Sequence, residues 1–164
     1  VGWALGPAAI IAKMRSLNSH VGAWAPMAEQ HAVANYLLND TELENYFTHF
    51  KSELEYRLHA IYNGIQQMKS SGLPIDAVAP QAAIYLTLQI DLVGKKTAGG
   101  NILDTQEDVT AYILNEAKLA IVPFYAFGTS RSSNWYRLSV GCCKKDEIEE
   151  MLGKLKAALE KVTP

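Results

Sequence analysis

The residue whose type and place most clearly suggest chemistry is an arginine inside an apolar strand pattern. Over residues 135 to 141 the side chains alternate, with Tyr136, Leu138 and Val140 on one face and Arg137 on the other. A planar guanidinium binds a carboxylate through two parallel, charge-assisted hydrogen bonds. Arg137 is therefore a candidate for binding the carboxylate of a small molecule. The alternative is an edge-strand arginine that pairs with a carboxylate of the protein itself.

Other chemically capable side chains lack the spacing that their chemistry needs. The 4 histidines show no metal-ligand spacing, so we expect no metal site. Lys95 and Lys96 are flanked by Gly and Thr rather than by the Gly-rich strand-to-helix pattern of a phosphate loop, which indicates a solvated turn. No nucleophile elbow and no paired-carboxylate pattern occurs. The sequence thus offers no catalytic residue of its own.

Charge and hydropathy exclude two classes of partner. With 15 Lys and Arg against 17 Asp and Glu, the formal net charge is −2, which gives no electrostatic basis for binding nucleic acid. Charges or prolines interrupt every apolar stretch well before the roughly 20 residues of a membrane-spanning helix. We therefore expect a soluble, cytoplasmic protein with no membrane contact. The 49% hydrophobic residues suffice for a buried core.

The elements that must position Arg137 follow from periodicity. Residues 7 to 18 and 26 to 38 have helical spacing, and a loop is expected between them. From residue 41 apolar residues recur at steps of three and four up to Gly72, a C-terminal cap, which predicts one long amphipathic helix.

A different pattern follows the stretch from residue 71 to 74. The sequence predicts strands at 84 to 90, 119 to 123 and 135 to 141, and helices at 105 to 117 and 144 to 162. Thr105, with Asp108 three residues on, resembles a capping box in which Asp replaces the usual Glu. The expected fold is α/β (α+β): helices, then a small α/β sandwich whose sheet of three to four strands is covered by helices.

Several segments, in order, resemble the class I and II aminotransferases of fold type I, the aspartate aminotransferase superfamily. The family patterns are Arg-x-Gly-Trp/Tyr-x-x-Gly-Pro, a loop before a Gln-bearing helix, Pro-x-Gly-Ala-Phe-Tyr-Leu/Ile, Val-Ala-Val-Val-Pro-Gly-x-x-Phe-Gly and x-Arg-Leu-Ser. They match residues 1–7, 17–30, 80–86, 119–128 and 136–139. Ala82 and Phe124 stand where the family commonly has glycine.

The resemblance implies a division of the chain and a cofactor. Residues 1–40 would end the large cofactor domain and include a dimer loop, residues 41–72 would be the connecting helix, and residues 73–164 the C-terminal small domain. The parent enzyme would use pyridoxal phosphate to transfer an amino group between an amino acid and a 2-oxo acid, as a homodimer. The Schiff-base lysine and the phosphate-binding arginine of the family would precede Val1, so this chain alone should be inactive.

The resemblance also gives roles to individual residues. Arg137 would grip the substrate α-carboxylate. Trp24 could line the substrate pocket of the partner subunit, or be a packing anchor. Tyr125, on the loop that leads to Arg137, could touch the substrate, or be an ordinary surface or core residue. The cofactor-binding residues are not identified.

Two other readings stay open from the sequence. The parent could be a related fold type I lyase or synthase, such as a carbon–sulfur lyase or an aminocyclopropane-carboxylate synthase or deaminase. The chain could also be a free-standing α/β binding or regulatory module. The sequence does not select a substrate amino acid.

Overall fold

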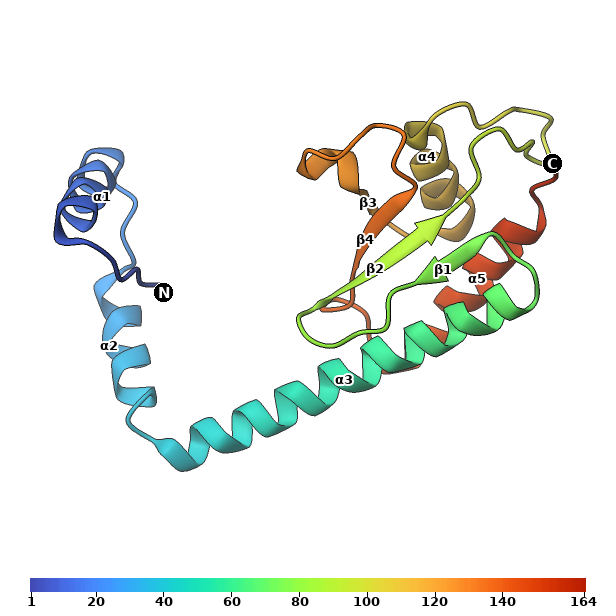
Figure 1. The fold of residues 1–164 in the computed structure, drawn as a ribbon. Coiled ribbons are helices and arrows are strands. Elements are labelled where there is room, and N and C mark those ends of the chain that lie inside the picture. The colour runs from blue at the N-terminus through green and yellow to red at the C-terminus, as the bar shows by residue number, and fades with distance from the viewer. The chain divides into compact units, whose positions relative to one another are not determined.

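A computed structural model describes residues 1–164, which divide into two compact units, Val1–Phe50 and Lys51–Pro164. Figure 1 shows the helices and strands of both units. None of the helices combines the length and the apolar character needed to cross a membrane. The α/β fold expected from the sequence is confirmed.

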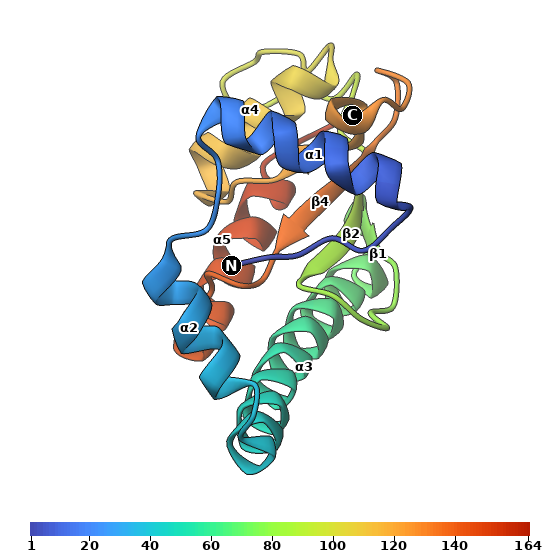
Figure 2. The same ribbon diagram turned by 90° about the vertical axis from the view of Figure 1, so that its left-hand side faces the viewer.

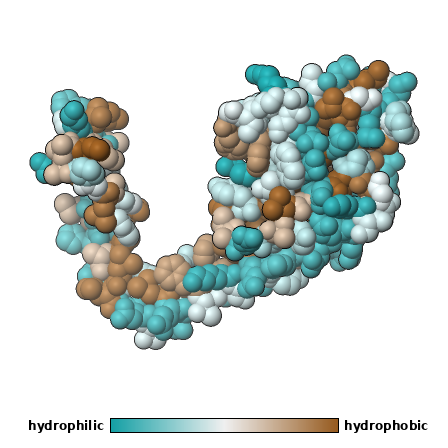
Figure 3. Space-filling model, in the orientation of Figure 1, coloured by the Kyte–Doolittle hydropathy of each residue, from teal (hydrophilic) through white to brown (hydrophobic).

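The first unit consists of helices without a buried core. Helix α1 is Ala8–Val21, helix α2 is Met27–Tyr36, and the unit ends within α3. None of its residues is fully buried, and large apolar side chains are exposed throughout the unit (Figure 3). These include Trp3, Leu5, Trp24, Met27 and Leu38. An apolar surface of this extent is typical of a segment that packs against another protein surface.

Helix α1 is longer than the sequence predicts. The expected helix ended at residue 18, but α1 continues to Val21 and stops at Gly22, whose φ of 72° is left-handed. Apolar periodicity ends earlier because the last turn carries polar side chains, and the helix end is set by Gly22, whose amide donates to the Asn18 carbonyl. The Ser19 hydroxyl donates to the Arg15 carbonyl at 2.9 Å, and His20 Nδ1 lies 2.7 Å from the Ser16 carbonyl.

Helix α3, Asp40–Ser70, confirms the long helix of the sequence analysis and contains 31 residues. Its buried residues all lie in its second half: Leu58, Ile61, Ile65 and Met68. The helix ends before Gly72, which adopts a φ of +85°, a conformation that glycine accepts without steric penalty.

The second unit contains a four-stranded antiparallel sheet in the order β1-β2-β4-β3 (Figure 1). Figure 2 shows β1, β2 and β4 of this sheet from another side. Its strands are β1 Ile75–Ala77, β2 Tyr85–Ile90, β3 Val122–Pro123 and β4 Trp135–Ser139. Three of them lie within predicted strands. Strand β1 has 3 residues, too few to show an alternating pattern, and was not predicted.

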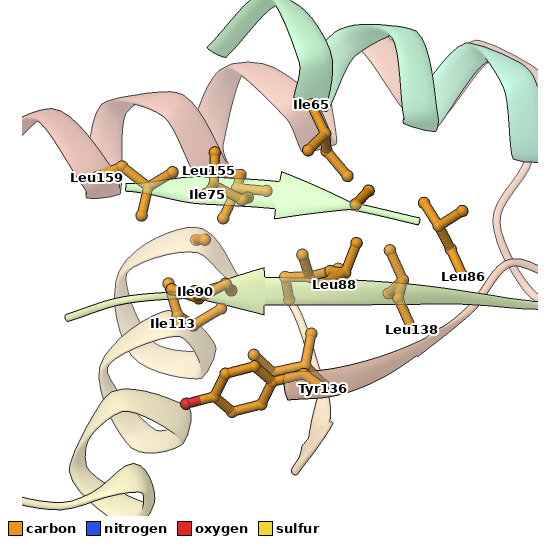
Figure 4. Close-up of a cluster of buried hydrophobic side chains, with 14 of the residues drawn as sticks. Ile65, Ile75, Leu86, Leu88, Ile90, Ile113, Tyr136, Leu138, Leu155 and Leu159 are labelled. Carbon is orange, nitrogen blue, oxygen red and sulfur yellow. The ribbon is translucent and has the colours of Figure 1, made fainter. Parts of the chain in front are cut away.

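One face of this sheet carries the hydrophobic core. Helix α3, helix α4 (Gln106–Ala117) and helix α5 (Ile148–Glu160) cover this face. Figure 4 shows Leu86 and Leu88 of β2 and Tyr136 of β4 among side chains from these helices. Burial of one such aliphatic side chain contributes about 1.5–3 kcal/mol. The opposite sheet face bears the alternate residues of each strand and no α-helix of this unit.

Helix α4 begins where the sequence predicts. The Thr105 hydroxyl accepts a hydrogen bond from the Asp108 amide at 3.1 Å, and Asp108 Oδ2 accepts one from the Thr105 amide at 2.9 Å. This is the expected capping box with Asp in place of Glu. The next residue after the cap, Gln106, is 5% exposed, and its Oε1 accepts a hydrogen bond from the hydroxyl of the fully buried Tyr136. Helix α4 is thereby tied to β4 beside Arg137.

Candidate functional site

The candidate site lies on the helix-free face of the sheet and is centred on Arg137. This residue is in β4, which lies between β2 and β3, and its Cα partners are Thr87 and Val122. Its neighbours Tyr136 and Leu138 are buried in the core. Because successive side chains of a strand point to opposite faces, Arg137 points away from the core. It is half-buried.

Two aromatic rings contact the Arg137 guanidinium. Its Cζ lies 4.4 Å from the ring centroid of Tyr85 and 4.4 Å from that of Phe127. Tyr85 reaches it from β2, where its Cα partner is Ser139. Phe127 is the last residue of η1, a 3-10 turn over Phe124–Phe127 that ends at Gly128 with a φ of 91°.

No carboxylate of the chain pairs with Arg137. The ion pairs of the structure join other residues, and none includes this guanidinium. Aromatic rings contact a cation through their π-faces and leave its N–H groups unused. Arg137 therefore keeps N–H groups that could donate hydrogen bonds to an external carboxylate. The alternative, an ion pair between Arg137 and a carboxylate of this chain, does not occur in the structure.

Tyr125 lies on the same loop but in different surroundings. Its ring lies below the Arg131 guanidinium, 5.2 Å from Cζ, and Arg131 Nη1 is 2.5 Å from Glu107 Oε1 at the start of α4. The pKa of Tyr125 is raised above its ordinary value by burial, and further by the charge of Glu107 and a hydrogen bond to it. A contact of Tyr125 with substrate stays a prediction.

Trp24 belongs to the first unit, so the structure does not relate it to Arg137. It is 66% exposed and lines two open hollows of about 300 and 540 Å³. Its loop is closed by Gln30, whose Nε2 donates to the Ala25 carbonyl at 2.7 Å. Trp24 is thus presented at the surface rather than packed inside, and its role in a substrate pocket stays a prediction.

The two rings at Arg137 were not predicted from the sequence. Tyr85 could have been found, because it alternates with buried Leu86 and so shares the face of Arg137 in an antiparallel pair. Phe127 gives no such signal. Its contact depends on the path of an irregular loop, which periodicity does not predict.

The lysines with known partners do not fit a Schiff-base role. Such a lysine must lose its proton, which requires desolvation or a neighbouring cation. The ammonium groups of several exposed lysines instead lie within 4 Å of carboxylates, which stabilise the charged form. These are Lys69, Lys144, Lys145, Lys154, Lys156 and Lys161. The pKa of Lys161 is accordingly raised, mainly by its hydrogen bond to Glu116.

Comparison with known proteins gives a consistent family. The model of the family "Aminotransferase class I and II" matches residues 1–155. The aspartate aminotransferase of Rhizobium meliloti (strain 1021) is 26% identical over 164 residues, which are 99% of this chain and 37% of that protein. A probable aspartate/prephenate aminotransferase of Rickettsia bellii is 26% identical over 159 residues, 96% of this chain and 37% of its own length.

Solved structures show the same fold. The aromatic aminotransferase of Pyrococcus horikoshii superposes with a TM-score of 0.74 at 23% identity, over 94% of this chain and 37% of that one. This chain therefore spans little more than a third of the length of the relatives that it matches.

Proposed function

This chain belongs to the class I and II aminotransferases, and from that membership we propose that it forms the C-terminal part of a pyridoxal-phosphate-dependent aminotransferase. In this proposal Arg137 binds the α-carboxylate of the amino acid or 2-oxo acid substrate. The observation that carries the proposal is the state of Arg137. Its guanidinium is contacted by two rings on an open sheet face, and no carboxylate of the chain pairs with it.

The chemistry of Arg137 suits this task. The guanidinium is always charged and presents parallel N–H donors, so it can hold a carboxylate in one orientation while another bond of the substrate reacts. Its contribution is binding and orientation, and it has no proton to exchange at neutral pH. Selectivity for a particular side chain would come from other parts of the pocket.

The other parts of the catalytic site would come from the part of the protein outside this chain. Pyridoxal phosphate, when bound, supplies an electron sink for carbanionic chemistry, but the lysines whose surroundings are described above do not fit its attachment point. We propose that residues 1–40 belong to the large domain and dimer loop, 41–72 to the connecting helix, and 73–164 to the small domain. The exposed apolar surface of the first unit would then pack on the large domain or on a second subunit, where Trp24 would approach the partner's pocket.

The test is substitution of Arg137 in the full-length protein. We expect Arg137→Ala to lower kcat/KM for amino acids and 2-oxo acids roughly a hundredfold or more, because one member of a charge-assisted pair is lost. Arg137→Lys should keep the charge but lose the parallel donors, and give an intermediate value. Primary amines without a carboxylate are the matched control and should react equally with all three proteins. Undiminished turnover of amino acids by Arg137→Ala would overturn the proposal.

A further inference from the structure

The position of the Arg137 guanidinium depends on two ring contacts of different origin. Tyr85 is fixed within β2, which pairs with β4 from Tyr85 to Gln89. Phe127 stands on the segment between β3 and β4, outside the sheet. Removal of either ring would leave a long, flexible side chain with one contact instead of two.

Phe127 is not held in place by the hydrophobic core. It is 53% exposed, and its other aromatic neighbour is Phe124 of the same turn, edge-on at 6.2 Å. The Gly128 amide donates to the Tyr125 carbonyl at 3.0 Å and closes the turn locally. These contacts shape the turn but do not attach it to the rest of the unit.

Beyond its continuity with β3, the turn has a further attachment through three side chains, here called the anchor cluster: Tyr125, Glu107 and Arg131. Arg131 Nη1 lies 2.5 Å from Glu107 Oε1, and the same guanidinium lies over the Tyr125 ring, with Cζ 5.2 Å from the ring centroid. Glu107 is in the first turn of α4, so the cluster joins the loop to a helix packed in the core. An isolated exposed ion pair contributes little, but Arg131 contacts both Glu107 and Tyr125, and two linked contacts restrain a loop more strongly than one.

We propose that Tyr85 and Phe127 are positioning residues for Arg137, and that the anchor cluster keeps Phe127 in its place. Each ring attracts the cation through its π-face and so limits the directions in which the guanidinium can point. Glu107 then influences Arg137 without touching it. The inference rests on the proposed function only where the oriented guanidinium is said to bind a carboxylate.

The test uses the ¹⁵N-labelled 164-residue chain and follows the side-chain Nε–H signal of Arg137, assigned with Arg137→Lys. Ring currents shift a proton that lies over an aromatic face, so the signal reports the ring contacts directly. We expect Phe127→Leu to move it toward the value of a solvent-exposed arginine, and Phe127→Tyr, which keeps the ring, to restore it. Glu107→Gln should move it in the same direction by a smaller amount.

Coupling separates this mechanism from a general loosening of the fold. If Glu107 acts through Phe127, then Glu107→Gln should have no further effect on Arg137 in the Phe127→Leu background. The matched control is Glu116→Gln, which removes another exposed ion pair of α4, with Lys161 at 2.9 Å, away from this loop. It should leave the Arg137 signal unchanged. Glu107, Glu116 and Phe127 are all exposed, and circular dichroism checks that each variant is folded.

Titration with sodium acetate, against sodium chloride at equal ionic strength, examines the carboxylate step. We expect acetate to shift the Arg137 signal and to bind about two- to fivefold more weakly to Phe127→Leu, the change equivalent to one exposed cation–π contact. A Glu107→Gln variant with an unchanged Arg137 signal, or one whose effect adds fully to that of Phe127→Leu, overturns the inference while acetate binding still supports the proposed function. Ring-dependent shifts without any acetate response support the positioning and count against the carboxylate role.

Discussion

Removal of the Tyr136 hydroxyl should destabilise the second unit by leaving a buried acceptor without its donor. In the folded chain Tyr136 is 0% exposed and its hydroxyl donates to Oε1 of Gln106, which is 5% exposed. Tyr136→Phe keeps the ring in the core but leaves Oε1 of Gln106 buried without a hydrogen-bond donor. An unsatisfied buried polar group costs about 1–3 kcal/mol.

Urea unfolding followed by circular dichroism measures this loss. With a denaturant slope of about 1–3 kcal/mol/M, the midpoint should fall by roughly 1 M. The double variant Tyr136→Phe with Gln106→Met removes both polar partners at similar volume and should recover most of the stability. Tyr85→Phe is the matched control, because Tyr85 is 41% exposed and loses only a solvated hydroxyl. A Tyr136→Phe variant as stable as the control, or a double variant less stable than either single one, would refute the reasoning.

Three further predictions concern other parts of the chain. Gly72→Ala should lower the free energy of unfolding by about 1–2 kcal/mol, because a φ of +85° is strained for a residue with a Cβ. Thermal unfolding measures this loss. The control is Gly99→Ala, at a glycine without a positive φ. The pKa of Asp76 is lowered below 3.8, first by its hydrogen bond from Lys69 and then by that from Gln66. The stabilisation by the Asp76 carboxylate is therefore complete above pH 3.8 and is lost as the pH falls through the folded pKa. The free energy of unfolding of Asp76→Asn should lack this decrease at acid pH. The same dependence on pH in the variant and the unsubstituted chain would contradict the prediction. Finally, borohydride treatment of the chain with pyridoxal phosphate should label no single lysine stoichiometrically, and mass spectrometry that finds one such lysine would contradict the proposed division of the enzyme.

The helices and strands β2 and β4 could be predicted because each shows its period over enough residues. Strand β3 has only 2 residues and lies within a short apolar run, 119–123, which was predicted as a strand without any period. The apolar stripe of α3 and the alternation in β2 both reflect burial of one face, and buried positions are occupied by apolar residue types. Strand β1 could not be predicted, since its 3 residues pair with β2 through the backbone. The end of α1 was misplaced because its last turn carries polar side chains rather than an apolar stripe, and because the left-handed Gly22 caps the helix three residues later than predicted.

The candidate site was predictable only at its centre. Arg137 is conspicuous because a charged residue interrupts an apolar strand, and the resemblance gave it a role. Its ring contacts join segments that are distant in sequence, and a single sequence contains no measure of such proximity. Tyr125 illustrates the difficulty. It lies in the 3-10 turn η1 of the segment between β3 and β4, and its ring contacts Arg131, whereas Phe127, two residues on, contacts Arg137.

The uneven burial along α3 has a consequence for how that helix opens. Its 31 residues form one hydrogen-bonded rod, but no residue before Leu58 is fully buried. Once the packed half has formed, each additional turn toward Asp40 extends an existing helix and avoids the unfavourable nucleation step. Amide exchange should therefore slow progressively from Asp40 toward the second half of the helix, and reach the rate of global unfolding near Ile65. The helix should therefore open most easily near Asp40 and least easily near Ile65.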